Sequence, residues 1–178
     1  PSGTVTVNHG ESTSISVTSI PTGYHFVNWT VYSGEATIAD NQQQSTSVTL
    51  TDNATVQANF APNTYTLTIN TSGAPGATTN PSGTTNVSHG ESTPISVTSI
   101  PDGYHFVNWT VESDGATIAD DQQQSTSVTL TSDATIQANF ALNTYTLTMA
   151  TSGAPGATTN PSGTVTVNHG ESTSISVT

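Results

Sequence analysis

The stretch Ala134-Thr-Ile-Gln-Ala-Asn-Phe140 alternates small or apolar side chains with polar ones along its whole length. Side chains of a β-strand point alternately to the two faces of a sheet, so a period of two indicates a strand with one buried face. The residues predicted to face the core are Ile136, Ala138 and Phe140. The stretch Tyr65-Thr-Leu-Thr-Ile69 has the same period, so we expect its three apolar residues to face the core as well.

Period-two runs continue through the rest of the chain, and no stretch shows sustained helical spacing. The further predicted strands are Ile95–Val97, Tyr104–Val111, Ala116–Ile118 and Ser127–Leu130. Turn residues such as Gly, Pro and Asp separate these runs. The apolar residues expected in the core from the second run are Val107, Trp109 and Val111. The pattern predicts an all-β fold built from small antiparallel units, either β-sandwich-like or β-grasp-like.

An internal repeat sets the organisation of the chain. The sequence Pro-Ser-Gly-Thr begins at Pro1, Pro81 and Pro161, a period of 80 residues. Residues 1–80 and 81–160 differ at only 15 positions, and residues 161–178 reproduce residues 1–18 without a change. Only about four residues separate the last strand of one unit from the first strand of the next, a short connection. We therefore expect tandem units of 80 residues, stacked in line and held in a nearly fixed relation.

Two motifs resemble a known family. The sequence Gly103-Tyr-His-Phe-Val-Asn-Trp109 and the closing Ala138-Asn-Phe-Ala141 are similar to the divergent InlB B-type repeats of bacterial surface proteins. The resemblance covers the whole chain and implies that a unit runs from the Tyr-Thr-Leu strand to Asn-Phe-Ala. Unit boundaries then fall near Asn63 and Asn143. The resemblance also implies large secreted or surface-anchored proteins whose repeats act as spacers and adhesive modules, not as enzymes.

These boundaries divide the chain into three parts. Residues 1–63 form an incomplete first repeat that lacks its first strand, residues 64–143 form a complete repeat, and residues 144–178 supply the opening strands of a third. A missing strand leaves an open sheet edge. Either the 178 residues are a piece of a longer polymer, or residues 144–160 of one chain complete the first repeat of the next. The self-assembly strand would then present Tyr145, Leu147 and Met149.

The composition excludes several classes of function. The chain has no Lys, Arg or Cys, and its 12 acidic residues give a net charge of -12. A nucleic-acid binder needs cationic side chains to neutralise phosphates, and binding to anionic lipid headgroups needs them too. Without Cys there is no disulfide, no thiolate metal site and no Cys nucleophile. No apolar run is long enough to cross a membrane. The lack of Lys and Arg also predicts resistance to proteases that cleave after basic residues.

The polar residues suggest little chemistry. His9, His89 and His169 lie in His-Gly-Glu-Ser turns, and His25 and His105 lie in the aromatic strand. No Cys or second His stands at ligand spacing from any of them, so we assign all five to turns and packing. No residue is predicted to be catalytic or to bind a cofactor.

Two ligands are alternatives that the sequence leaves open. Turn carboxylates could gather around Ca²⁺, which takes oxygen ligands. The calcium candidates are Asp114, Asp120, Asp121 and Asp133. Trp29 and Trp109 could stack on sugar rings, although one Trp at a fixed place in each unit is also what a small β core requires.

The sequence thus predicts an extracellular or cell-surface structural protein that forms a stiff, acidic filament or surface stalk. Its partners would be copies of itself, in a continuous array or head to tail, with glycans or a host or cell surface as further candidates. The alternative is a carbohydrate- or calcium-dependent binding module of a surface adhesin. An enzyme is not expected, because the candidate groups form no set of nucleophile, base and electrophile at a recognisable spacing.

Overall fold

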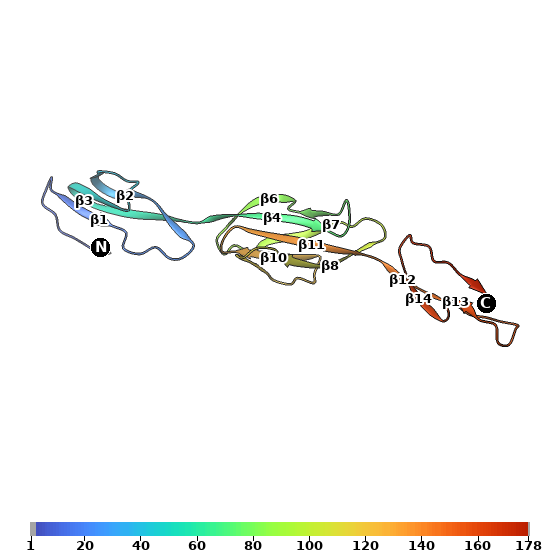
Figure 1. Cartoon of the computed structure of the whole chain (residues 1–178). Helices are drawn as coiled ribbons and strands as arrows, with labels where there is room; N and C mark the ends of the chain where they lie inside the picture. Colours follow the sequence, from blue (N-terminus) through green and yellow to red (C-terminus); the bar gives the residue numbers. More distant parts are fainter. Residues whose placement is uncertain (1–2, 178) are drawn as a thin grey trace. The chain divides into compact units, whose positions relative to one another are not determined.

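The computed structural model describes residues 3–177, which form strands, turns and irregular segments without a helix. The chain divides into two compact units. The first comprises residues 1–64 with 88–90, and the second comprises residues 65–87 with 91–178. Figure 1 shows the strands of both units. Within the described residues there is accordingly no helix that could span a membrane. The predicted all-β fold class is confirmed.

The complete repeat is built from two four-stranded sheets. The strands of one sheet, in order, are β5 (Thr78–Asn80), β7 (Thr93–Ser99), β10 (Ser125–Leu130) and β9 (Ala116–Ile118). The strands of the other, in order, are β6 (Gly83–Ser88), β4 (Thr64–Ser72), β11 (Ala134–Leu142) and β8 (Tyr104–Val111). All six predicted strands are present, and the period-two pattern did not predict the short strands β5 and β6.

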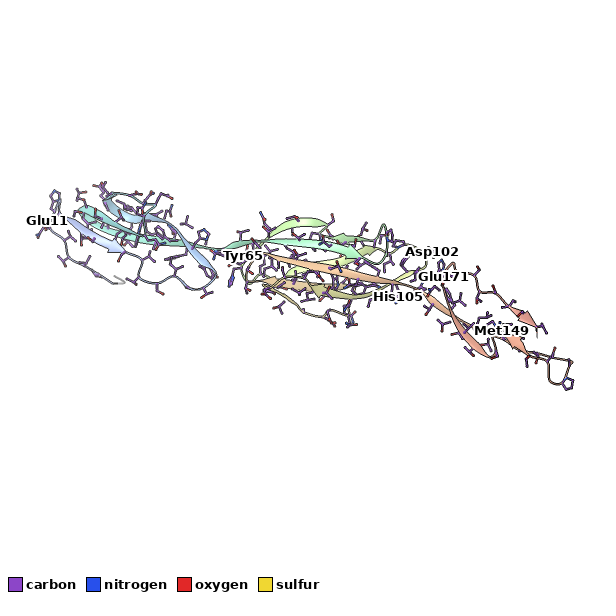
Figure 2. All side chains as sticks on the ribbon, in the orientation of Figure 1. Glu11, Tyr65, Asp102, His105, Met149 and Glu171 are labelled. Carbon is purple, nitrogen blue, oxygen red and sulfur yellow. The ribbon has the colours of Figure 1, made fainter. Side chains whose placement is uncertain are left out.

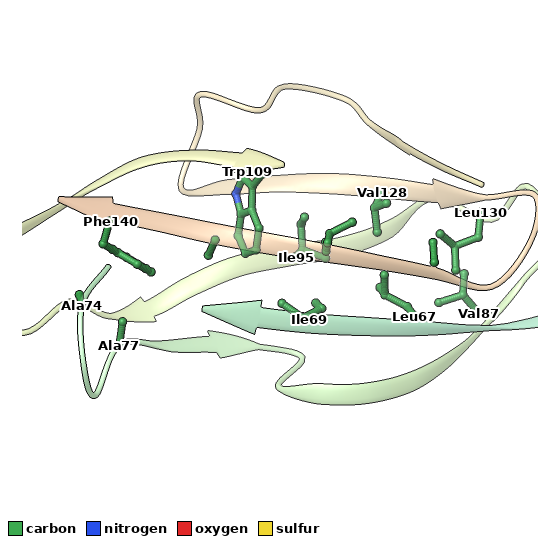
Figure 3. Close-up of a cluster of buried hydrophobic side chains, with 13 residues drawn as sticks. Leu67, Ile69, Ala74, Ala77, Val87, Ile95, Trp109, Val128, Leu130 and Phe140 are labelled. Atoms are coloured by element: carbon green, nitrogen blue, oxygen red, sulfur yellow. The ribbon is translucent and has the colours of Figure 1, made fainter. Parts of the chain in front are cut away.

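The hydrophobic core of the complete repeat receives side chains from both sheets, as Figure 3 shows. The first sheet contributes Ile95, Val128 and Leu130; the second contributes Leu67, Ile69, Val87, Trp109, Ile136, Ala138 and Phe140. The inward positions predicted for β11 are therefore confirmed. In β4, the predicted inward residues Leu67 and Ile69 are buried, and Tyr65 is half-buried against the same cluster. This arrangement is a small β-sandwich.

One strand departs from the prediction for its apolar residues. Trp109 is buried as expected, but Val107 and Val111 are 42% and 41% exposed. The register of β8 on β11 shifts at this place, since Asn139 faces Asn108 whereas Phe140 faces Phe106. Val107 is thus the extra residue of a β-bulge, which turns its side chain away from the core. Val111 is the last residue of an edge strand, so no further strand covers it.

The pairing of β4 with β11 is parallel. The pairings of β10 with β7, β10 with β9, β11 with β8 and β5 with β7 are antiparallel. Its register places Leu67 opposite Ala134 and Ile69 opposite Ile136. The strand that opens the repeat therefore lies beside the strand that closes it. Because β4 also pairs with β6, it occupies the centre of its sheet. Alternation in the sequence fixes which face of a strand is buried, but it does not identify the partner strand.

The first unit contains one three-stranded sheet. In order, its strands are β1 (Ser12–Ser16), β3 (Ser45–Pro62) and β2 (Tyr24–Ile38). The long strands β2 and β3 each run continuously where the complete repeat has two shorter strands, β8 with β9 and β10 with β11. The buried cluster contains only Ile15, Trp29 and Val48.

The third repeat consists of two pairs of strands within the second unit. One pair joins β12 (Thr144–Thr148) to β14 (Thr164–Asn168), and the other joins β13 (Thr159–Asn160) to β15 (Ser176–Val177). By sequence, β12 corresponds to β4 and β14 corresponds to β6 of the complete repeat. The third repeat therefore has the first half of the β6-β4-β11-β8 sheet.

Candidate assembly site

Asn143, which lies between β11 and β12, connects three segments of the second unit. Its backbone N–H donates to the carbonyl of Gly103 at 2.8 Å, and its own carbonyl accepts the N–H of His169 at 2.8 Å. Its side-chain oxygen lies 2.9 Å from Nδ1 of His105. Figure 2 shows His105, Asp102 and Glu171 close together in this region of the second unit. These bonds tie the complete repeat to the turn that follows β14 in the third.

His169 packs directly on Gly103 in the same region. Gly103 is buried and has φ of +81°, a backbone conformation that favours glycine. A Cβ atom at this position would also collide with the imidazole ring of His169. The ring also meets Tyr145, with Nδ1 3.4 Å from the phenol oxygen and ring centroids 6.1 Å apart. We call Gly103, His105, Asn143, Tyr145 and His169 the repeat junction.

The same arrangement occurs wholly within the first unit. Asn63 donates its backbone N–H to the carbonyl of Gly23 at 2.7 Å and accepts the N–H of His89 at 2.8 Å. Its side-chain oxygen lies 3.0 Å from Nδ1 of His25. Gly23 has φ of +83°, and a Cβ atom there would collide with the ring of His89. The arrangement is thus a property of the repeat and not of one place in the chain.

The histidine assignments made from the sequence fit these contacts only in part. Packing was predicted, but its target was not: His89 and His169 each lie on a glycine about 66 positions earlier in the chain. Gly23 and Gly103 each close a Pro-x-Gly turn and recur at the repeat period together with the His-Gly-Glu-Ser turns, but this recurrence does not show that the two motifs touch. His9 makes a different contact, because its Nδ1 lies 3.2 Å from the backbone carbonyl of Thr51.

The second part of the site is the edge of β3 that corresponds to the β4-facing edge of β11. Residues 54–59 of β3 match residues 134–139 of β11 except for Val56, which replaces Ile136. Among the described residues, no strand pairs with this edge over residues 54–59 of β3, whereas β1 pairs with residues 45–49 of the same strand. Phe60 is 42% exposed, whereas its counterpart Phe140 is 6% exposed. Apolar side chains beside this edge of β3 are therefore more exposed than their equivalents in the complete repeat, which are buried.

A cavity of about 300 Å³ lies beside this edge. Its walls include core residues of the first unit together with the segment 3–5: Gly3, Thr4, Val5, Thr13, Ile15, Trp29, Val48, Leu50, Ala54, Thr55 and Val56. In the complete repeat, the equivalents of Ala54 and Val56 pair with Leu67 and Ile69 of β4. The cavity thus adjoins the place that a β4-type strand would take.

The predicted self-assembly strand coincides with β12 and the residue after it. Tyr145 is 55% exposed, and Leu147 and Met149 are half-buried, whereas Leu67 and Ile69 of β4 are buried. Figure 2 shows Met149 just past β12. The strand pairs with β14 along one edge, and among the described residues no strand pairs with its other edge. Its role in assembly stays a prediction.

Three of the four calcium candidates accept hydrogen bonds, and the fourth, Asp114, is exposed. Asp120 accepts the N–H of Gln122 at 3.0 Å, and Asp121 accepts the side-chain amide of the same residue at 3.3 Å. Asp133 accepts the N–H of Thr66 at 2.8 Å. Within residues 3–177, no group of three His, Cys, Asp or Glu residues lies together in a way that could hold a metal ion.

The two tryptophans lie inside the repeats. Trp109 is 1% exposed and Trp29 is 8% exposed. The indole N–H of Trp109 donates to the backbone carbonyl of Gln123 at 3.0 Å, and that of Trp29 donates to the backbone carbonyl of Gln43 at 3.0 Å. A ring packed in this way has no free face on which a sugar could stack. Both indoles therefore serve the core.

Two features of these residues concern how β units meet: the hydrogen bonds of the repeat junction, and the edge of β3 that no strand covers over residues 54–59 in the described part of the chain. The class that this fold defines is a tandem-repeat domain of the all-β kind. The family model of the divergent InlB B-repeat domain matches residues 1–64 and again residues 65–144, and the chain belongs to this family. The family suggests a bacterial surface or secreted protein. No curated protein and no solved structure matches the chain.

Proposed function

We propose that this chain is a structural segment of an extracellular, surface-attached or secreted bacterial protein. Its repeats act in series as a stiff spacer, a stalk or filament, that carries adhesive contacts at its edges or ends, and the chain is not an enzyme. The observation that carries this proposal is the repeat junction, which closes the connection between β11 and β12 with two backbone hydrogen bonds around Asn143.

Stiffness follows from the number of constraints on a short connection. Only Asn143 separates the end of β11 from the start of β12. Its N–H and carbonyl are both bonded, and the ring of His169 contacts both Gly103 and Tyr145. A linker whose polar groups are bonded and whose neighbours are packed has few alternative conformations, unlike a Gly- and Ser-rich tether.

Surface chemistry supports a role outside the cell. A chain without Lys or Arg offers no site to trypsin-like proteases, and a net charge of -12 keeps neighbouring molecules apart in solution. The polar face of each strand consists mainly of uncharged Thr, Ser, Asn and Gln. Such a surface suits a polymer that persists in a protease-rich environment.

The experiment is a spin-label distance measurement across the repeat junction. The chain has no Cys, so labels at Thr117→Cys and Thr166→Cys, both on exposed strand positions, attach only there. We expect one narrow distance distribution. His169→Ala should broaden it, whereas the matched control His9→Ala, in the same turn motif of the first repeat, should leave it unchanged. A broad distribution in the unsubstituted chain would refute a stiff connection.

A further inference from the structure

The chain enters and leaves the complete repeat through two neighbouring strands. β4 begins immediately after Asn63, which connects it to β3, and β11 ends immediately before Asn143, which connects it to β12. The two strands lie side by side in the middle of their sheet, as Figure 1 shows. Tension along the backbone of the tandem repeats must therefore pass into β4 at its first residue and out of β11 at its last.

The parallel direction of this pair decides how tension acts on it. Parallel strands begin at the same end of their ladder, so the first residue of β4 and the last residue of β11 lie at opposite ends. Six residue pairs lie between them, from Leu67 opposite Ala134 to Ser72 opposite Asn139. The hydrogen bonds of a parallel pair are evenly spaced, so a pull along the strands loads all of them together. In an antiparallel pair the two ends would lie together, and the same pull would open the bonds one after another.

We propose that the pairing of β4 with β11 is a mechanical clamp, the element that keeps the repeat folded while the chain is under tension. This further function rests on the proposed function for the source of the tension, because a surface stalk or filament is pulled at both ends. It goes beyond stiffness, since a repeat that is stiffly connected to its neighbour can still unfold at a low force.

Buried side chains resist sliding of the two strands. Leu67 and Ile69 of β4, and Ile136 and Ala138 of β11, are at most 4% exposed. Figure 3 shows Leu67 and Ile69 among the packed side chains of the core. The next register that keeps the same face of β4 inward is two residues away, about 6.6 Å along the strand. A close-packed core leaves no room for such a movement, so the hydrogen bonds and the packing must break together.

The two strands are also held by their other neighbours. β6 pairs with the second edge of β4, and β8 pairs with the second edge of β11. A strand at the edge of a sheet can peel away alone. In contrast, β4 and β11 can separate only if the four-stranded sheet divides into two halves, which adds the packing of β6 and β8 to the resistance.

Each end of the ladder carries an additional contact between the same two parts of the chain. At the end where tension enters, a carboxylate oxygen of Asp133 accepts the backbone N–H of Thr66 at 2.8 Å. A hydrogen bond to a charged acceptor is stronger than one between neutral groups. At the other end, Gly73 lies so close to the carbonyl of Phe140 that a Cβ atom on this glycine would collide with it. Both contacts must break before β4 can slide along β11.

The first test compares two directions of pulling on the same repeat in single-molecule force spectroscopy. The whole chain has no Cys, so handles attach only where Cys is introduced. Handles at Thr64→Cys and Leu142→Cys pull along the ladder, whereas handles at Ser72→Cys and Leu142→Cys pull at one end of it. All three positions are exposed. We expect the first direction to need at least about twice the force at equal loading rate, since forced unfolding is governed by the unfolding rate. Equal forces in the two directions overturn the proposal.

A second test asks which sheet sets the unfolding rate under tension along the ladder. Ile136→Val removes one methyl group from β11, and the matched control Ile95→Val removes one from β7 of the other sheet. Both side chains are buried, Ile136 at 0% and Ile95 at 1% exposure, so the two changes should lower the stability in urea to a similar extent. The first repeat already has Val56 at the position of Ile136. At a given force we expect only Ile136→Val to unfold faster, by about threefold or more.

Equal acceleration by the two variants overturns the assignment of the clamp to β4 and β11. The handles lie at residues 64, 72 and 142, so no pull crosses Asn143. The spin-label distance across the repeat junction involves no force on the complete repeat. Failure of the clamp and failure of the stiff-spacer proposal are therefore told apart.

Discussion

The first repeat and the complete repeat have closely similar sequences but differ in how far their cores are closed. The complete repeat buries 13 residues in one cluster between two sheets, whereas the first buries three beside a single sheet. The difference does not come from the residues of the closing strand, which are almost the same in β3 and β11. It comes from β4, which covers one edge of β11. The comparison shows that the core side chains of β11 are buried where β4 pairs with it, whereas the equivalent side chains of β3 are more exposed where no strand is paired.

The largest expected difference in unfolding free energy is between the same substitution in the two closing strands, β11 and β3. Phe140→Ala removes a buried ring and should lower the free energy of unfolding of the complete repeat by about 3–5 kcal/mol. Phe60→Ala removes an equivalent ring that is already exposed in part, so we expect at most about 2 kcal/mol, since the transfer term scales with buried area. Urea unfolding followed by Trp109 or by Trp29, each with the other changed to Phe, measures the two. Equal losses would break the comparison.

The next largest difference in unfolding free energy is expected between the same substitution in the two opening strands, β4 and β12. Leu67→Ala should destabilise the complete repeat by about 2–5 kcal/mol, because the side chain is fully buried and a cavity remains. Leu147→Ala, the same change in β12, should cost about 1 kcal/mol or less because this side chain is only half-buried. Thermal or urea unfolding at low protein concentration provides both values. A large loss from Leu147→Ala at that concentration would mean that β12 is already covered.

The repeat junction should respond to a single methyl group. Gly103→Ala places a side chain at positive φ, at a cost of about 1–3 kcal/mol, and also forces His169 away. The control Gly83→Ala has positive φ as well but open space around it. We expect amide exchange of His169 to accelerate about tenfold or more in Gly103→Ala, equivalent to about 1.4 kcal/mol of local opening. The control should leave this amide unchanged.

A smaller change in unfolding free energy is expected at a position where the two repeats differ in sequence, Asp133 in the complete repeat and Asn53 in the first. Asp133 accepts the N–H of Thr66 from β4, and the first repeat has Asn53 at the equivalent position. Asp133→Asn replaces a charge-assisted bond with a neutral one, so the complete repeat should lose about 0.5–1 kcal/mol. Asn53→Asp should not change the stability of the first repeat, because no β4-type strand lies there to donate. A gain from Asn53→Asp in the isolated chain would show that its edge is occupied.

Adding calcium should change the melting temperature of the chain least of all these experiments. The four candidate carboxylates form no group that could hold a metal ion within residues 3–177, so we expect the melting temperature to stay unchanged on adding millimolar CaCl₂. A ligand present at 100 times its dissociation constant would add about 2.7 kcal/mol. A rise in melting temperature that EDTA reverses would therefore restore the calcium-binding alternative.

The sequence was sufficient for the strands and for most of the core. Alternation identified β11 and the inward side chains of β4, and the single Trp of each repeat was placed in the core. It could not predict the bulge at Val107, because a one-residue shift in register depends on the partner strand. It also could not show that β4 pairs with β11 in parallel, since alternation carries no information on neighbours.

The contact of His169 with Gly103 was likewise beyond the sequence argument. The two residues lie far apart in the chain, and their proximity depends on the path of β11 into β12. The repeat period shows that both motifs recur, but recurrence alone does not say that they touch. The domain boundaries near Asn63 and Asn143, drawn from the resemblance, stay a prediction.

Amide hydrogen exchange along β3 and β11 in one sample tests the central claim most directly. At micromolar concentration, every residue from 134 to 139 should be protected, whereas every second residue from 54 to 59 should exchange at least a hundredfold faster. Equal protection of the two strands at the lowest concentration, unchanged by dilution, would contradict the account.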